Sequence, residues 1–130
     1  MSKLLFEEIT REIIASAMEV HRTLGPGFLE GVYAEALEYE LEKRGLKFVR
    51  EQELNIRYKD VILKKTYRAD YIVADSVLVK NKATNGLVKE DYAQMFNYLK
   101  VTGKKLGLLC NFGKPSLEWK RIICESYKKI

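Results

Sequence analysis

The sequence predicts an α/β domain in which a mixed β-sheet is flanked by helices. Apolar residues recur at helical spacing through the first 43 residues, and from residue 48 to 83 they alternate with polar residues. Residues 105–112 are almost continuously apolar, as in a strand buried on both faces. The expected element order is α-α-β-β-β-α-β-β, and the length of 130 residues predicts a single domain spanning 1–130.

Two helices are expected first. The earlier one spans about 6–23 and places Ile9, Ile13 and Ala17 on one face. It ends at Gly25-Pro26-Gly27, because proline disfavours helical geometry in the residue before it. The second helix spans about 29–43 and ends before Gly45, a residue that accepts the left-handed conformation of a helix cap.

Short strands and turns are expected next. Lys59-Asp60 is predicted to be a turn between residues 54–58 and 61–63, and Ala74-Asp75 a tight turn between strands 66–73 and 77–83. A third helix is expected at about 88–101. Two further strands are expected, at 105–112 and, at an edge of the sheet, 119–124. This order describes an antiparallel meander, a crossover helix and a buried strand.

Asp70 lies in the middle of an otherwise apolar strand. If Ala74-Asp75 is the turn, residues whose numbers sum to about 149 pair across the hairpin, so Asp70 lies near Val79 and Lys80. Lys82 shares the face of Lys80 because side chains alternate with a period of two. A carboxylate in an apolar strand needs a partner or a metal ion, which makes Asp70 a candidate site residue.

Three motifs accompany Asp70. The first is Asp70 followed on the next strand by Lys80-Asn81-Lys82, at the position of an acid-x-Lys element. The others are Gln94-x-x-x-Tyr98 and Gly27-x-x-Glu30-x-x-Tyr33. Together with the segments 68–70, 97–100 and 107–113, they make the chain from about His21 to Ile123 resemble the PD-(D/E)xK nuclease superfamily, and within it the GxxExxY protein family. The resemblance implies a restriction-endonuclease-like fold.

The resemblance also implies a chemistry. Active members hold Mg²⁺ or Mn²⁺ with carboxylates and hydrolyse phosphodiester bonds of nucleic acid, so it implies nucleic acid as the partner, with DNA favoured over RNA. Transferred to this chain, the candidate metal ligands are Asp70, Glu30 and His21. Lys82 becomes the catalytic lysine, while Gln94 and Tyr98 orient the substrate or the lysine.

Lys80 departs from the family pattern. It stands where the family has a glutamate, so a metal ligand has become a cation beside Asp70. Two lysines near one aspartate are expected to repel Mg²⁺, so hydrolysis is predicted to be impaired or lost, with no metal cofactor in an inactive protein. The same cations fit a phosphate, bound by Lys80, Lys82 and Arg68, or Lys80 forms an ion pair with Asp70. Glu90 and Asp75 are alternative acids, but the register gives neither much support.

Several candidates have structural alternatives. Glu30 near a helix start interacts favourably with the helix dipole, and His21 on an apolar helix face is compatible with a core histidine. Tyr33 and Tyr98 are compatible with core aromatics whose hydroxyls reach water. Gln94 is expected to face the sheet, where a buried amide needs hydrogen bonds.

Charge and composition leave three function classes. The net charge of +5 and pI of about 9.1 fit a polyanionic partner. No stretch has 18 consecutive apolar residues, so no membrane association is expected, and the two cysteines are expected to be reduced in a cytoplasmic protein. The classes are a metal-dependent phosphodiesterase, a nucleic-acid-binding module without chemistry, and a homodimer formed through the first helix or the edge strand.

Overall fold

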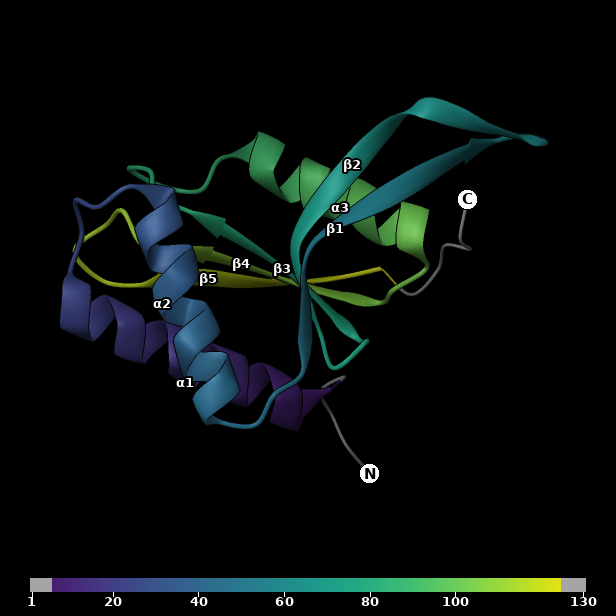
Figure 1. Ribbon diagram of the computed structural model, residues 1–130. Helices are drawn as coiled ribbons and strands as arrows, with labels where there is room; N and C mark the ends of the chain where they lie inside the picture. The colour runs from purple at the N-terminus through teal and green to yellow at the C-terminus, as the bar shows by residue number, and fades with distance from the viewer. Residues whose placement is uncertain (1–5, 125–130) are drawn as a thin grey trace.

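The computed structural model describes residues 6–124, and the predicted element order is confirmed (Figure 1). Every strand begins and ends within a few residues of the expected bounds except in the first hairpin. The elements are α1 (Glu7–Leu24), α2 (Glu30–Lys43), β1 (Phe48–Tyr58), β2 (Val61–Val73), β3 (Val77–Lys82), α3 (Lys89–Thr102), β4 (Leu106–Asn111) and β5 (Glu118–Ile123).

The five strands form one mixed sheet in the order β1-β2-β3-β4-β5. All neighbours are antiparallel except β3 and β4, which are parallel and joined by the crossover helix α3. All six residues of β4 are buried, as its apolar sequence predicts for a central strand. β5 lies at an edge, as expected. The restriction-endonuclease-like α/β architecture is therefore present.

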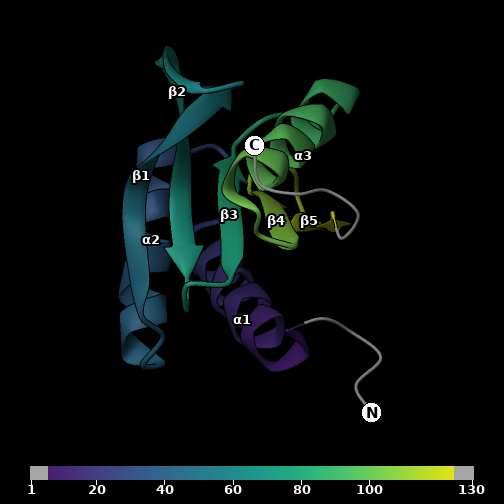
Figure 2. The same cartoon turned by 90° about the vertical axis from the view of Figure 1, so that its right-hand side faces the viewer.

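Helices cover both faces of the sheet (Figure 2). α1 and α2 pack on one face, where Ile13, Leu37 and Leu108 belong to a common buried cluster. α3 packs on the other face, where Met95 and Leu99 join Leu78 in a second cluster. No helix within residues 6–124 is long and apolar enough to cross a bilayer.

The turn between β2 and β3 corrects the predicted register. Val73 pairs with Val77, so three residues rather than two form the turn, and Ala74 and Asp75 both adopt left-handed conformations with φ of 52° and 54°. Paired residues therefore sum to 150, as in Tyr71 with Val79. The extra turn residue moves the register by one and directs Asp70 towards Lys80.

The first hairpin differs most from the prediction. Instead of several short strands, β1 has 11 residues and β2 has 13, and the hairpin projects beyond the rest of the molecule (Figures 1 and 2). Its register shifts between Asn55 and Arg57, where β2 contains two more residues than β1. We call residues 57–65 the arm. All nine of them are exposed.

Candidate functional site

Asp70 and Lys80 meet on the α3 face of the sheet. The Lys80 Nζ lies 3.4 Å from Asp70 Oδ1, and the other carboxylate oxygen accepts the backbone N–H of Asn81 at 2.7 Å. Both side chains are largely buried, with 28% of Asp70 and 21% of Lys80 exposed. Lys80 therefore supplies the charge partner that a mid-strand carboxylate needs.

Lys82 has a carboxylate partner that the sequence analysis missed. Its Nζ lies 3.4 Å from Asp91 Oδ1, and the second oxygen of Asp91 accepts the backbone N–H of Val88 at 2.9 Å. Asp91 therefore pairs with Lys82 and caps the start of α3. Glu90, considered earlier as an alternative acid, is exposed. The spacing of Asp91, seven residues before Tyr98, was the available signal, since two helical turns place these two side chains on the same face.

Tyr98 contributes its ring and hydroxyl from the next turns of α3. Its ring centroid lies 4.9 Å from that of Tyr67. Burial raises the pKa of Tyr98, Lys80 lowers it, and Asp70 and Tyr67 raise it further, so the hydroxyl remains protonated at neutral pH and senses both charged groups. The expectation that Gln94 is buried against the sheet is wrong, because Gln94 is exposed on α3.

These side chains form what we call the motif site, consisting of Asp70, Lys80, Lys82, Asp91 and Tyr98. Its two ammonium groups are matched by two carboxylates, so its formal charge is zero. An acid in place of Lys80 would give a charge of −2, since one cation is lost and one anion is gained. A unit charge at about 4 Å acts on another with about 4 kcal/mol at an effective dielectric constant of 20. This difference decides how the site treats a divalent cation.

His21 does not join the motif site. Its Nε2 lies 2.8 Å from the carbonyl oxygen of Lys114, and its ring stacks on Phe112 with centroids 6.4 Å apart. His21 is buried on α1, which packs against the opposite face of the sheet from α3. This environment is that of a core histidine, which was the structural alternative to a metal ligand that the sequence left open.

The Gly27-x-x-Glu30-x-x-Tyr33 motif shapes a loop. The Tyr33 hydroxyl donates to the carbonyl oxygen of Gly25 at 2.5 Å and accepts the N–H of Phe28 at 3.2 Å, while its ring stacks on Phe112. Glu30 is exposed in the first turn of α2. Within residues 6–124 it forms no ion pair with either lysine of the motif site, and its position suits the helix dipole.

Asn111 holds the loop that leads from β3 into α3. Its Oδ1 accepts the N–H groups of Thr84 and Gly113, and its Nδ2 donates to the Thr84 carbonyl and to Glu118. The hydrogen bond from Asn111 lowers the pKa of Glu118; burial opposes this, and the N–H of Leu87 and nearby lysines reinforce it. This network fixes where α3 begins and so where Asp91 meets Lys82.

The other predicted cations and acids lie elsewhere. Arg68 forms an exposed ion pair with Glu51 at 3.9 Å rather than joining Lys80 and Lys82. Asp75 lies in the β2–β3 turn, where it pairs with Lys104 at 3.1 Å. Neither Arg68 nor Asp75 is hydrogen-bonded or ion-paired to the motif site within the described residues.

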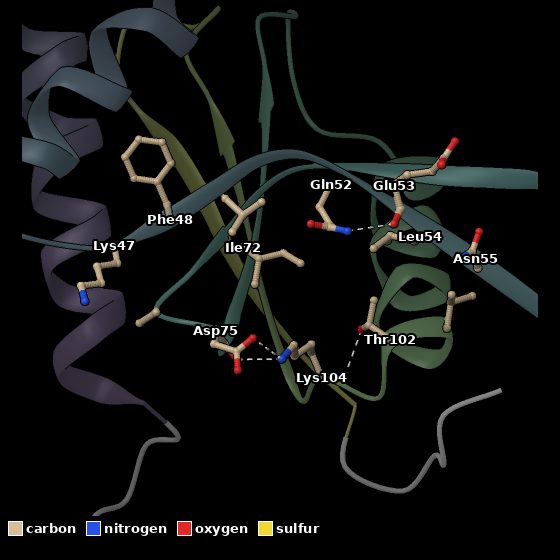
Figure 3. Close-up of a pocket in the computed structure, with 13 residues that line it drawn as sticks. Lys47, Phe48, Gln52, Glu53, Leu54, Asn55, Ile72, Asp75, Thr102 and Lys104 are labelled. Carbon is tan, nitrogen blue, oxygen red and sulfur yellow. Dashed lines mark hydrogen bonds and ion pairs between the residues drawn. The ribbon is translucent and has the colours of Figure 1, made fainter.

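A cleft of about 840 Å³ lies between β1 and the end of α3 (Figure 3). Leu54, Ile72 and Thr102 line it, together with the Asp75–Lys104 pair. α3 begins near Asp91 and ends at Thr102, so the cleft and the Lys82–Asp91 pair lie at opposite ends of this helix. None of the motif-site residues lines the cleft.

The residues present do not fit a bound divalent metal. Within residues 6–124, no group of three or more histidine, cysteine, aspartate and glutamate side chains is placed to hold one ion. Asp70 faces an ammonium group, Glu30 is exposed in the first turn of α2, and His21 contacts the carbonyl oxygen of Lys114. Mg²⁺ and Mn²⁺ need several oxygen ligands, which the motif site does not assemble.

A mixed sheet that carries Asp70 and the Lys82 element on neighbouring strands, with a tyrosine helix above, defines a nuclease-like α/β domain. The chain belongs to the PD-(D/E)XK nuclease superfamily, whose family model matches residues 7–122. The fold is similar to the crystal structure of SSO0001, with a TM-score of 0.61 and 18% sequence identity over 96% of this chain. The matched region is 60% of the SSO0001 chain. The comparison with curated proteins gives no match.

Proposed function

We propose that this protein is a nuclease-fold domain that binds nucleic acid, DNA in preference to RNA, without metal-dependent hydrolysis. The observation that carries the proposal is the 3.4 Å pair between Lys80 and Asp70. It places a cation where the family has a metal-binding acid, and it engages the Asp70 carboxylate. The superfamily and the net charge of +5 support a polyanionic partner.

The proposal assigns a structural role to the residues that would otherwise perform catalysis. Lys82 is held by Asp91, and Asp70 is held by Lys80 and by the N–H of Asn81. Because both carboxylates of the motif site are already paired with ammonium groups and its formal charge is zero, the site offers a divalent cation no net attraction. Lys80 and Lys82 are also expected to bind phosphate weakly, because each ammonium group is already paired with a carboxylate.

The finer assignment to the GxxExxY family is part of the proposal. Gly27, Glu30 and Tyr33 carry that motif, and the contacts of Tyr33 with Gly25 and Phe28 give it a purpose, namely to shape the loop before α2. We also infer that residues 1–130 act as one domain, because both apolar clusters use the same sheet.

The test is nicking of supercoiled plasmid DNA with Mg²⁺ or Mn²⁺. The wild-type protein is expected to leave the plasmid intact. Cleavage that disappears in Asp70→Ala would show that the motif site is catalytic and would overturn the proposal.

Metal affinity gives a second measurement. Lys80→Glu changes the motif-site charge by two units and is expected to raise the Mn²⁺ affinity measured by calorimetry by about tenfold or more. Lys80→Gln, which removes only the positive charge, is expected to show a smaller increase. Lys120→Glu makes the same charge reversal at an exposed position of β5 and is the matched control, with no expected change in Mn²⁺ affinity. Equal Mn²⁺ affinity in the wild type and all three variants would show that Lys80 does not determine metal binding, contrary to the proposal.

A further inference from the structure

The arm differs from the motif site in the state of its cations. Arg57, Lys59, Lys64 and Lys65 are all exposed, and none forms an ion pair within residues 6–124. Asp60 is the single acid among the nine arm residues, so the arm carries a net charge of +3. Unpaired, solvated cations release counterions from a polyanion, whereas paired lysines must first lose a carboxylate.

The arm also exposes apolar side chains at its tip. Tyr58 pairs with Val61 beside the Lys59–Asp60 turn, and Ile62 pairs with Arg57. These apolar residues are half exposed, at 58% for Tyr58, 50% for Val61 and 52% for Ile62. Tyr58 and Val61 share one face of the ribbon and Ile62 lies on the other, so exposed apolar side chains flank charged ones on both faces of the tip, as in a binding surface. Among the described residues, the Lys59 Nζ lies over the Tyr58 ring, 5.5 Å from its centroid, and all three apolar residues remain half exposed.

The shape of the arm matches one class of polyanion. The arm is the end of a two-stranded β-ribbon that projects from the body of the molecule (Figures 1 and 2). The major groove of B-form DNA admits a two-stranded β-ribbon. The major groove of an RNA duplex is too narrow and deep for such an element. Basic residues along the ribbon then face phosphates, and the apolar tip reaches base edges such as the thymine methyl group.

We propose that the arm, residues 57–65, is a DNA-binding ribbon that inserts into the groove of a B-form duplex. This proposal rests on the proposed function in one respect, namely that nucleic acid is the partner. It adds that binding resides in the arm and does not depend on the motif site. The apolar tip distinguishes groove insertion from simple charge attraction, because a purely electrostatic surface has no use for Val61 and Ile62.

The test is the salt dependence of binding to a short fluorescent DNA duplex, measured by anisotropy. The variant Arg57→Gln/Lys59→Gln/Lys64→Gln/Lys65→Gln is expected to reduce the slope of log K against log salt by about 0.9 per lost phosphate contact, or about 3.6 for four. The matched control removes the same charge from exposed lysines outside the arm, as Lys43→Gln/Lys47→Gln/Lys105→Gln/Lys120→Gln. The control is expected to change the slope by less than about one.

The double variant Val61→Ser/Ile62→Ser tests the apolar tip. It is expected to weaken duplex DNA binding several-fold with an unchanged salt slope, and its exposed positions leave folding intact. Equal effects of the two quadruple variants would overturn the arm proposal while leaving DNA binding by the protein in place. Absence of DNA binding by the wild type would overturn both this proposal and the binding half of the proposed function.

Two further outcomes identify a different partner. Equal or tighter binding of an RNA duplex of the same sequence would contradict groove insertion, because the A-form groove excludes the ribbon. Sedimentation of the wild type as a dimer that Val61→Ser/Ile62→Ser converts to a monomer would assign the tip to a second copy of this chain. Either outcome would overturn the proposal. A monomer that prefers DNA supports it.

Discussion

The motif site and the arm contain similar residues in opposite electrostatic states. In the motif site, Lys80 and Lys82 are largely buried and each lies 3.4 Å from a carboxylate. In the arm, four cations are exposed without ion pairs within the described chain. Lysine in a nuclease motif is therefore insufficient evidence for phosphate binding, because its partners decide whether the charge is available. The motif site contributes to stability, and the arm is proposed to contribute to affinity.

Among the variants near the motif site, Asn111→Leu is expected to lower the free energy of unfolding the most. Asn111→Leu removes four hydrogen bonds that hold the loop before α3 and leaves backbone groups unpaired, at a cost of about 3 kcal/mol. Urea unfolding measures the loss. DNA affinity measured well below the unfolding midpoint should stay within about twofold, because the arm does not contact Asn111.

Asp70→Ala is expected to have the next largest effect. It leaves the Lys80 ammonium without its carboxylate and the N–H of Asn81 without an acceptor, and it should lower the free energy of unfolding by about 2 kcal/mol. DNA affinity should not fall, since a negative charge is removed. A tenfold loss of affinity in a folded Asp70→Ala protein would break the comparison and return binding to the motif site.

Asn81→Leu is expected to stabilise the protein, whereas the two preceding variants destabilise it. Asn81 is 1% exposed and its side-chain oxygen and nitrogen have no hydrogen-bond partner within the described residues. Replacing this amide with an apolar group of similar size should raise the free energy of unfolding by about 1 kcal/mol. A decrease on thermal or urea unfolding would reveal a buried water that satisfies the amide.

Lowering the pH is expected to have the smallest effect on the free energy of unfolding. Because the pKa of Glu118 is lowered in the folded protein, its contribution to stability is complete above the ordinary value of 4.5 and declines as pH falls through the lower folded value. Glu118→Gln should flatten this part of the stability–pH curve. Glu118 lies outside the arm, so DNA affinity of the folded Glu118→Gln protein should follow that of the wild type between pH 5 and 7 within about twofold.

The order of elements and much of the motif site could be predicted from the sequence. Apolar periodicity located all three helices, and the alternation of strands brought Asp70 to Lys80 and put Lys82 on the same face. The predicted Asp70–Lys80 ion pair is present at 3.4 Å. The helices follow from repeats that one segment displays by itself, and the Asp70–Lys80 pair follows from strand alternation together with the turn that joins β2 and β3.

The remaining features depend on contacts that no local pattern displays. The left-handed Ala74 and Asp75 lengthen the turn by one residue, although neither is a glycine. Asp91 meets Lys82 only because Asn111 fixes the intervening loop, and Gln94 is exposed because α3 turns that position away from the sheet. The arm was missed because its tip looked like two short strands with an ordinary turn.

Strand β2, which carries both Asp70 and part of the arm, has a second irregularity in its pairing with β1. Pairing between β1 and β2 passes from Arg50–Tyr71 to Gln52–Ala69 without a Glu51–Asp70 pair, and Glu51 is left-handed with φ of 51°. The ladder that carries the arm is thus interrupted at Asp70. Asp70 is instead held from the other side, by the Lys80 ammonium and the Asn81 N–H of β3, so β3 and not β1 fixes the position of its carboxylate.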